Sequence, residues 1–187
     1  MATTDTRSGR HTGVRRVADL RLRGPGGATP VRVRWPQIAD ADAAPPLVVL
    51  LPDVAPANGV ERADDDLAVE LCTGVGAVVL CTPWAPQRAG ALDRAEAALT
   101  WTADHGDELG ADPARLAVAG RGAGAAGAAA LALRARRRAW PSIRCQILVL
   151  TDAVWLRATG AEVVELNGID AAATSLRKAL SGRGEDR

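Results

Sequence analysis

The residues best placed to do chemistry in this chain follow its apolar segments. Asp53 comes shortly after the apolar run 47–51, and Asp152 comes shortly after the run 145–150. If both runs are strands of one sheet, the two carboxylates could meet and act as an acid and base pair toward water. Aspartates at strand ends also form turns and cap helices, so a purely structural role is the competing interpretation.

A glycine-rich turn follows another apolar run, residues 115–119. Gly122, Gly124 and Gly127 form a G-x-G-x-x-G pattern where a helix is expected to begin. In dinucleotide-binding folds this pattern brings the backbone close to a pyrophosphate, and an acid such as Asp152 bonds the ribose. The sequence contains 19 glycines, so the pattern can also arise without a ligand.

Two further residues of this turn, Arg121 and Ala123, are candidates for anion binding. The N-terminus of a helix presents backbone N–H groups that attract anions, and the side chain of Arg121 would add positive charge. The competing interpretation makes Arg121 a solvated turn residue.

Periodic apolar segments must position these residues. Runs that are apolar throughout predict strands covered on both faces, and they lie at residues 47–51, 76–81, 115–119 and 145–150. Segments with helical periodicity lie between them, at residues 64–73, 89–105 and 123–138. Alternating apolar and polar residues predict a hairpin from 17–23 and 31–34, joined by the turn 24–27. A strand at 162–166 and a helix at 169–180 complete the pattern.

This alternation predicts an α/β fold, a three-layer sandwich with a mostly parallel sheet and an antiparallel hairpin at its N-terminal edge. Ligands in such folds bind at the carboxyl ends of the strands. We expect one domain over residues 17–181, a disordered leader over 1–16 and a flexible tail over 182–187.

The composition argues against several classes of function. The 187 residues include 23 Lys and Arg against 22 Asp and Glu, a net charge of +1, which predicts no nucleic-acid partner and no anionic membrane partner. No apolar run approaches the ~20 residues that span a bilayer, and no signal-like core precedes the domain, which favours a cytoplasmic location. Cys72, Cys81 and Cys145 lack the spacing of metal ligands and are expected to be buried reduced thiols. We expect no metal site and no cofactor.

Other charged groups are expected to have structural roles. His105 ends a helical segment, where a histidine complements the carboxyl end of the helix, and the acidic run 64–66 complements the positive end of the helix that it begins. Arg134 and the run 136–138 end another helix and are expected to form a solvated cationic face, with a phosphate or partner site as the less favoured alternative.

The segments 91–101 and 108–120 carry a resemblance to a known family. The second reads ELGADPARLAVAG and, together with 128–134 and 156–166, resembles the hormone-sensitive-lipase-like branch of the α/β-hydrolase fold, the branch of small bacterial esterases and acetylhydrolases. The resemblance extends over most of the chain. It implies the same three-layer fold and a nucleophilic serine in a sharp turn between a strand and a helix.

The family's motif G-x-S-x-G falls on Gly120-Arg121-Gly122-Ala123-Gly124, with Gly122 in the place of the serine. The family's H-G-G-G stretch, which supplies amides to the oxyanion hole, falls on residues 52–55, where Pro52 has no N–H. No histidine follows His105, and the segment 152–156 leaves little room for the strand that carries the catalytic acid. The resemblance therefore implies an esterase frame without a catalytic triad.

We therefore expect a non-catalytic protein that acts by binding or assembly. Its expected partners are a second copy, paired through the exposed last strand, or an active hydrolase homologue. Two alternatives stay open: a weak ester hydrolase that uses Asp53 or Asp152 with water, and a nucleotide or dinucleotide binder at the glycine turn.

In hydrolases the sharp strand-to-helix turn that presents the nucleophile is called the nucleophile elbow. If the turn 120–124 is an elbow inherited from a hydrolase, three geometric features are expected. Gly122 should have a positive φ, and Gly124 and Gly127 should be required for close packing between helix and strand. Trp84 or the segment 52–56 should obstruct the groove that a dinucleotide would occupy.

Overall fold

The computed structural model describes residues 13–24, 27–37, 44–52, 65–149 and 162–165, the last of these as backbone only. Its strands form one seven-stranded sheet with the order β1-β2-β4-β3-β5-β6-β7. They are β1 (Val14–Gly24), β2 (Gly27–Pro36), β3 (Pro46–Leu51), β4 (Val78–Cys81), β5 (Asp112–Arg121), β6 (Cys145–Val149) and β7 (Glu162–Glu165). The neighbouring strands β4, β3, β5, β6 and β7 pair in parallel. The strands β1 and β2 pair antiparallel to each other, and β2 pairs antiparallel to β4.

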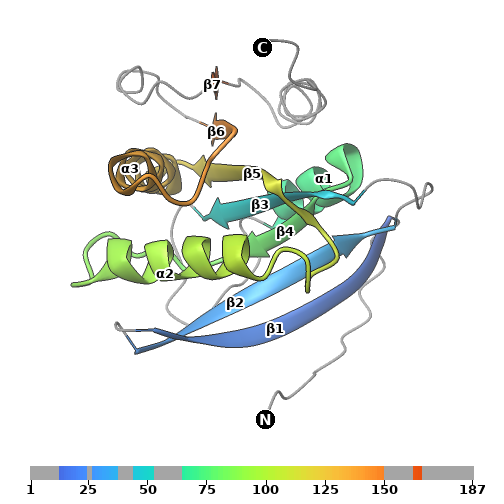
Figure 1. Cartoon of the computed structure of the whole chain (residues 1–187), viewed down its shortest axis with the longest axis horizontal. Helices are drawn as coiled ribbons and strands as arrows, with labels where there is room; N and C mark the ends of the chain where they lie inside the picture. The colour runs from blue at the N-terminus through green and yellow to red at the C-terminus, as the bar shows by residue number, and fades with distance from the viewer. Residues whose placement is uncertain (1–12, 25–26, 38–43, 53–64, 150–161, 166–187) are drawn as a thin grey trace.

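Helices cover both faces of this sheet (Figure 1). The helices α2 (Ala91–Asp104) and α3 (Ala123–Arg138) pack on one face, and α1 (Asp65–Val75) packs on the other. The fully buried strand β3 shows why both layers are needed, because alternate side chains point to opposite faces. Val49 faces α2 and α3, whereas Val48 and Leu50 face α1. The expected three-layer α/β sandwich is therefore confirmed.

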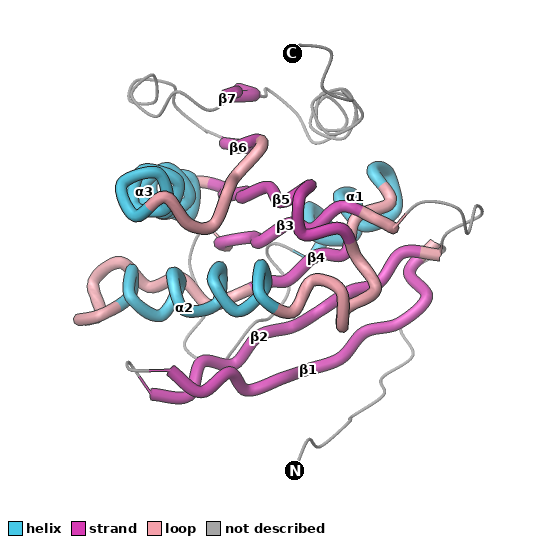
Figure 2. Tube along the Cα trace, viewed as in Figure 1, coloured by secondary structure: helices cyan, strands magenta, loops and turns pink. Residues whose placement is uncertain are grey.

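The hairpin β1–β2 forms a long twisted ribbon at the N-terminal edge (Figure 2). Ala18 and Leu22 point into the core, whereas Asp19 and Arg21 between them are exposed. Asp19 lies opposite Arg32, whose Nε donates to Asp19 Oδ1 over 2.7 Å. The hydrogen bond from Arg32 lowers the pKa of the Asp19 carboxyl, because it stabilises the charged form.

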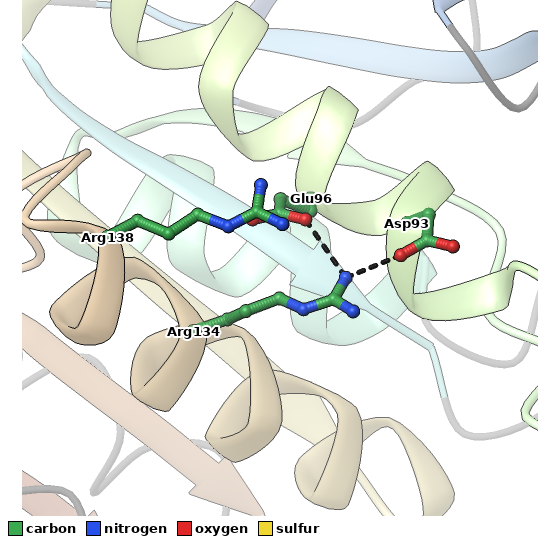
Figure 3. A network of polar contacts seen from close by, with 4 residues as sticks. All are labelled: Asp93, Glu96, Arg134 and Arg138. Atoms are coloured by element: carbon green, nitrogen blue, oxygen red, sulfur yellow. Dashed lines mark hydrogen bonds and ion pairs between the residues drawn. The ribbon is translucent and has the colours of Figure 1, made fainter.

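An ion-pair network joins α2 to α3 (Figure 3). Arg134 Nη1 lies 2.6 Å from Asp93 Oδ1 and 2.9 Å from Glu96 Oε2, and Arg138 Nη1 lies 2.8 Å from Glu96 Oε1. The hydrogen bond to Asp93 raises the pKa of Arg134. The network links the two helices on this face, and it gives two arginines of the expected cationic face an ion-pairing partner on the neighbouring helix.

The helix bounds follow the local backbone. α3 has the predicted bounds, 123–138, whereas α2 is shorter than the predicted 89–105. Gly90, with φ of 71°, and His105, with φ of −114°, flank α2 as its caps. The leader, the tail and the helix expected at 169–180 lie outside the described residues.

Candidate functional site

The carboxyl ends of four parallel strands lie side by side at one edge of the sheet. Leu51 of β3 pairs with Gly120 of β5, and Arg121 of β5 pairs with Val149 of β6. On the other side of β3, Leu50 pairs with Cys81 at the end of β4. The turn after β5 therefore lies between the ends of β3 and β6, which is where ligands collect in folds of this class.

Gly122 forms a sharp turn between β5 and α3. Its φ is 53° and its ψ is −121°, a conformation that residues with a Cβ rarely adopt. Its N–H donates to the carbonyl oxygen of Val149 over 3.0 Å, and its own carbonyl accepts from the N–H of Ala125 over 3.1 Å. The predicted positive φ at Gly122 is confirmed, so the backbone has the strand-to-helix turn that presents a nucleophile in hydrolases.

The glycines around this turn allow the helix to lie directly on the strands. A Cβ on Gly120 would clash with the carbonyl oxygen of Gly124, and a Cβ on Gly124 would clash with the carbonyl oxygen of Leu51. A Cβ on Gly127 would come within 2.7 Å of the Trp84 indole and 2.8 Å of Leu51 Cδ2. The close packing predicted at Gly124 and Gly127 is confirmed.

Trp84 connects the segment after β4 to the first turn of α3. Its Nε1 donates to the carbonyl oxygen of Ala123 over 2.9 Å, its ring packs against Gly127, and only 6% of the residue is exposed. The sequence suggested this tryptophan as an obstruction but contained no sign of the hydrogen bond. The bond holds the indole against one side of the glycine turn.

Thr82 is a buried polar residue directly after β4 on this edge. Its N–H continues the sheet by donating to the carbonyl oxygen of Leu50 over 3.1 Å. The residue is fully buried, and its Oγ1 has no hydrogen-bond partner within the part of the chain that the structure describes. An unpaired buried hydroxyl costs about 1–3 kcal/mol, so a polar group placed beside it would stabilise the fold.

Among the described residues, the turn at Gly122 has no nucleophilic side chain. Gly122 provides no nucleophile, and Arg121 beside it is half-buried at the end of β5. His105, the described histidine, is the C-cap of α2, with Nδ1 2.9 Å from the Trp101 carbonyl oxygen and its ring stacked on the Trp101 ring at 4.5 Å. Because α2 ends where β5 is about to begin, His105 lies at the amino edge of the sheet, away from Gly122. Its predicted position at a helix carboxyl end is confirmed.

Most of the aspartates named as candidates from the sequence lie in segments that the structure does not describe. Asp53 and Asp152 lie outside the described residues, as does Asp64, whereas Asp65 begins α1. Within the described ranges no cluster of His, Cys, Asp and Glu could hold a metal ion. No described helix is long and apolar enough to cross a membrane.

The three cysteines are buried free thiols, as predicted. Burial raises the pKa of the Cys72 thiol from 9.0 to about 12, although the positive charge of Arg34 acts in the opposite direction. The Cys81 Sγ accepts a hydrogen bond from Arg34 Nη1 over 3.4 Å. A thiol with a raised pKa is a poor nucleophile at neutral pH, so the buried Cys72 is not a candidate nucleophile.

Comparisons with known proteins agree with this geometry. The sequence model of the alpha/beta hydrolase fold family matches residues 58–180. Esterase LipI of Mycobacterium tuberculosis is 34% identical over 144 residues, which cover 75% of this chain and 45% of that protein. The chain thus spans less than half of the length of this curated relative.

Solved structures of esterases have the same fold. The hyperthermophilic esterase of Pyrobaculum calidifontis has 30% sequence identity and a TM-score of 0.62, covering 73% of this chain and 45% of that one. A bacterial heroin esterase has 26% identity and a TM-score of 0.65, covering 74% and 44%. The carboxylesterase EstE1, from a metagenomic library, has 19% identity and a TM-score of 0.72 and covers 90% of both chains, a similarity of fold alone.

Proposed function

Because the chain belongs to the α/β-hydrolase fold family and has glycine at the position of the nucleophile, we propose that it is a non-catalytic member that acts by binding or assembly. The observation that carries this proposal is the backbone of Gly122. With φ of 53° and ψ of −121°, Gly122 has the geometry of the elbow but no side chain to attack a carbonyl. The turn that would present a nucleophile is present, and the nucleophile is absent.

Two features of the same edge support a binding role. The buried Thr82 hydroxyl has no partner among the described residues, and a polar ligand would satisfy it only if this edge opened to admit the ligand. The turn also begins the 16-residue helix α3, and the positive end of a helix favours a carbonyl or carboxylate oxygen. A bound ester or carboxylate would thus be held at this edge without being cleaved.

A dinucleotide is the less favoured ligand for the glycine turn. The Trp84 ring lies against Gly127 and is fixed there by its bond to Ala123. A pyrophosphate that approaches this turn would meet an indole on one side. The glycine pattern is explained instead by contacts of Gly120 and Gly124 with neighbouring backbone atoms.

Assembly is proposed to use the last described strand. β7 pairs in parallel with β6 and is at the end of the strand order of the described sheet. An edge strand offers backbone groups for pairing with a second copy or with an active homologue. Light scattering at several protein concentrations tests the homodimer, and a monomer at every concentration would leave binding of a small ligand or of another protein as the role.

The activity test compares the full chain with two variants at one position. Wild type, Gly122→Ser and Gly122→Ala are assayed with p-nitrophenyl acetate and butyrate, and thermal stability is measured with the same esters, with acetate, and with NAD and ATP. We expect no turnover by wild type and stabilisation by an ester or a carboxylate. Turnover that persists through repurification would overturn the proposal in favour of a hydrolase, in which case asparagine variants of Asp53 and Asp152 identify the acid.

The two variants separate chemistry from strain. Both place a Cβ at the same φ of 53°, so they share the backbone penalty, and only Gly122→Ser adds a hydroxyl. We expect Gly122→Ser to remain nearly inactive, because the described histidine lies at the opposite edge and triad groups act as a unit. Efficient hydrolysis by Gly122→Ser alone would show that a base and an acid are already in place.

A further inference from the structure

The positive charges of the chain are concentrated in one segment. Between Asp112 and Asp152 the sequence contains seven arginines and neither aspartate nor glutamate. The net charge of +1 averages over this asymmetry. The net charge of the whole chain therefore does not describe the surface that this segment forms, which is strongly positive and could attract an anionic partner.

The C-terminal end of α3 presents these charges beside an exposed tryptophan. Arg134 and Arg138 are engaged by Asp93 and Glu96 of α2 (Figure 3). Arg136 and Arg137, in the same turn, are exposed, as Arg138 is, and Arg136 also has an interaction partner of its own. The helix ends at Ala139, whose φ of 55° turns the chain, and the next residue, Trp140, is 50% exposed.

Trp140 is held in this position by the helix end. Its N–H donates to the carbonyl oxygen of Ala135 over 3.1 Å. Four residues further, just before β6, the backbone N–H of the exposed Arg144 donates to the Leu116 carbonyl oxygen over 2.9 Å. We call Arg136, Arg137, Trp140 and Arg144 the arginine–tryptophan patch. Within the described residues, Trp140 is the exposed large apolar side chain, and every charged member of the patch is a cation.

We propose that the arginine–tryptophan patch docks the protein on the surface of an anionic lipid membrane. Tryptophan combines an apolar ring with a polar N–H and is favoured at the boundary between lipid and water. Arginine side chains pair with lipid phosphates, and each one near an anionic surface strengthens binding by about 1 kcal/mol, which is about fivefold.

The composition of the patch favours a lipid surface over a protein partner. A protein interface of ordinary size requires about 800 Å² on each side with a desolvated apolar centre. The patch offers a single large apolar side chain, with the exposed Arg136 and Arg137 before it in the chain and the exposed Arg144 after it. Such a surface suits shallow insertion of one aromatic ring among charged headgroups. Nucleic acid is the other polyanion that the patch could bind, and an oligonucleotide is therefore tested beside the vesicles.

The position of the patch makes this inference independent of the proposed function. α3 has 16 residues, so at 1.5 Å per residue its two ends are about 24 Å apart. The elbow lies at the N-terminal end of α3 and the patch at its C-terminal end. A membrane at the patch would leave the turn at Gly122 free to bind its own ligand, whether or not that ligand is cleaved.

The test measures binding of the full chain to lipid vesicles by co-sedimentation. Vesicles of phosphatidylcholine alone are compared with vesicles of phosphatidylcholine and phosphatidylglycerol at 3:1, in 0.05, 0.15 and 0.5 M NaCl. We expect binding to the anionic vesicles alone, weakening steadily as salt screens the charges. Vesicles with brominated acyl chains should quench tryptophan fluorescence in wild type and much less in Trp140→Phe.

Variants with a matched control localise the surface. Arg137→Glu removes one cation and adds one anion, so binding to anionic vesicles should fall about 25-fold, the square of the fivefold effect of a single charge. Arg23→Glu makes the same change in net charge at an exposed site on β1 and should have little effect. Circular dichroism checks that both variants are folded.

Any of four results would overturn the proposal. One is equal loss of binding in Arg137→Glu and Arg23→Glu, which would mean that net charge alone matters. Another is equal binding to neutral and anionic vesicles, or quenching that survives Trp140→Phe. The last is salt-sensitive binding to a 20-base oligonucleotide without binding to vesicles, which would assign the patch to nucleic acid.

Discussion

The contact between Trp84 and Gly127 can be measured by a double-mutant cycle. In an ordinary helix interior, replacing glycine by alanine stabilises the fold by about 1 kcal/mol. At Gly127 the added Cβ would lie 2.7 Å from the Trp84 ring and 2.8 Å from Leu51 Cδ2, and such overpacking costs about 1–3 kcal/mol. We therefore expect Gly127→Ala to lower the free energy of unfolding by up to about 2 kcal/mol.

The second arm of the cycle removes the ring. Trp84→Leu alone should destabilise the fold by about 2–4 kcal/mol, because it loses buried area and the bond to Ala123. In that background Gly127→Ala should be clearly less destabilising than in wild type, because the indole no longer opposes the helix propensity of alanine and only Leu51 Cδ2 stays close to the added Cβ. The coupling free energy between the two sites should thus be about 1–3 kcal/mol.

Urea denaturation followed by far-UV circular dichroism supplies all four free energies. Gly124→Ala is the comparison variant. Its Cβ would clash with the backbone carbonyl of Leu51, which cannot rotate away, so it should be more destabilising than Gly127→Ala in either background. If Gly127→Ala stabilises the wild-type protein by about 1 kcal/mol and couples to Trp84→Leu by less than about 0.5 kcal/mol, the packing described for Trp84 is refuted.

Two further predictions concern the elbow and a buried thiol. Gly122→Ala should lower the free energy of unfolding by about 1–2 kcal/mol, because alanine is strained at φ of 53°; equilibrium urea curves check this, and an unchanged midpoint would contradict the positive φ. The folded-state pKa of Cys72 is raised from 9.0 to about 12, so between these values the folded state holds the thiol proton more tightly than the unfolded state does. The thiol should therefore leave the free energy of unfolding unaffected below pH 9. As pH rises from 9 toward 12, it should lower that free energy by at most about 1.4 kcal/mol per pH unit. Urea curves at pH 8 and 10 should therefore differ more for wild type than for Cys72→Ala, and equal differences would refute burial as the cause.

The sequence predicted features that depend on local pattern. α3 has the predicted bounds because an alanine-rich segment follows the Gly122 turn and ends before Pro141. The elbow geometry was predictable because a sharp strand-to-helix turn requires a positive φ, which glycine adopts without strain. β5 is longer than its apolar run, 115–119, because Asp112 also pairs with Pro46, in a half-exposed part of the strand that hydrophobicity does not mark.

The sequence could not predict features that depend on how distant elements meet. The bond from Trp84 to Ala123 requires the segment after β4 to reach across to α3, which no spacing along the chain reveals. The pairing of Arg134 with Asp93 and Glu96 depends on how α2 and α3 lie on the sheet. Buried polar groups are usually hydrogen-bonded, so nothing in the sequence indicated a buried Thr82 hydroxyl without a partner among the described residues.

The central claim is that the elbow of this chain is intact in its backbone and has no nucleophile. Intact-mass spectrometry of the full chain after incubation with a fluorophosphonate tests it most directly, because the probe bonds to an activated hydroxyl and requires no knowledge of the substrate. We predict no mass adduct on wild-type protein under conditions in which an active serine esterase is labelled to completion. A stoichiometric adduct on the wild-type chain, mapped to any residue, would contradict the claim.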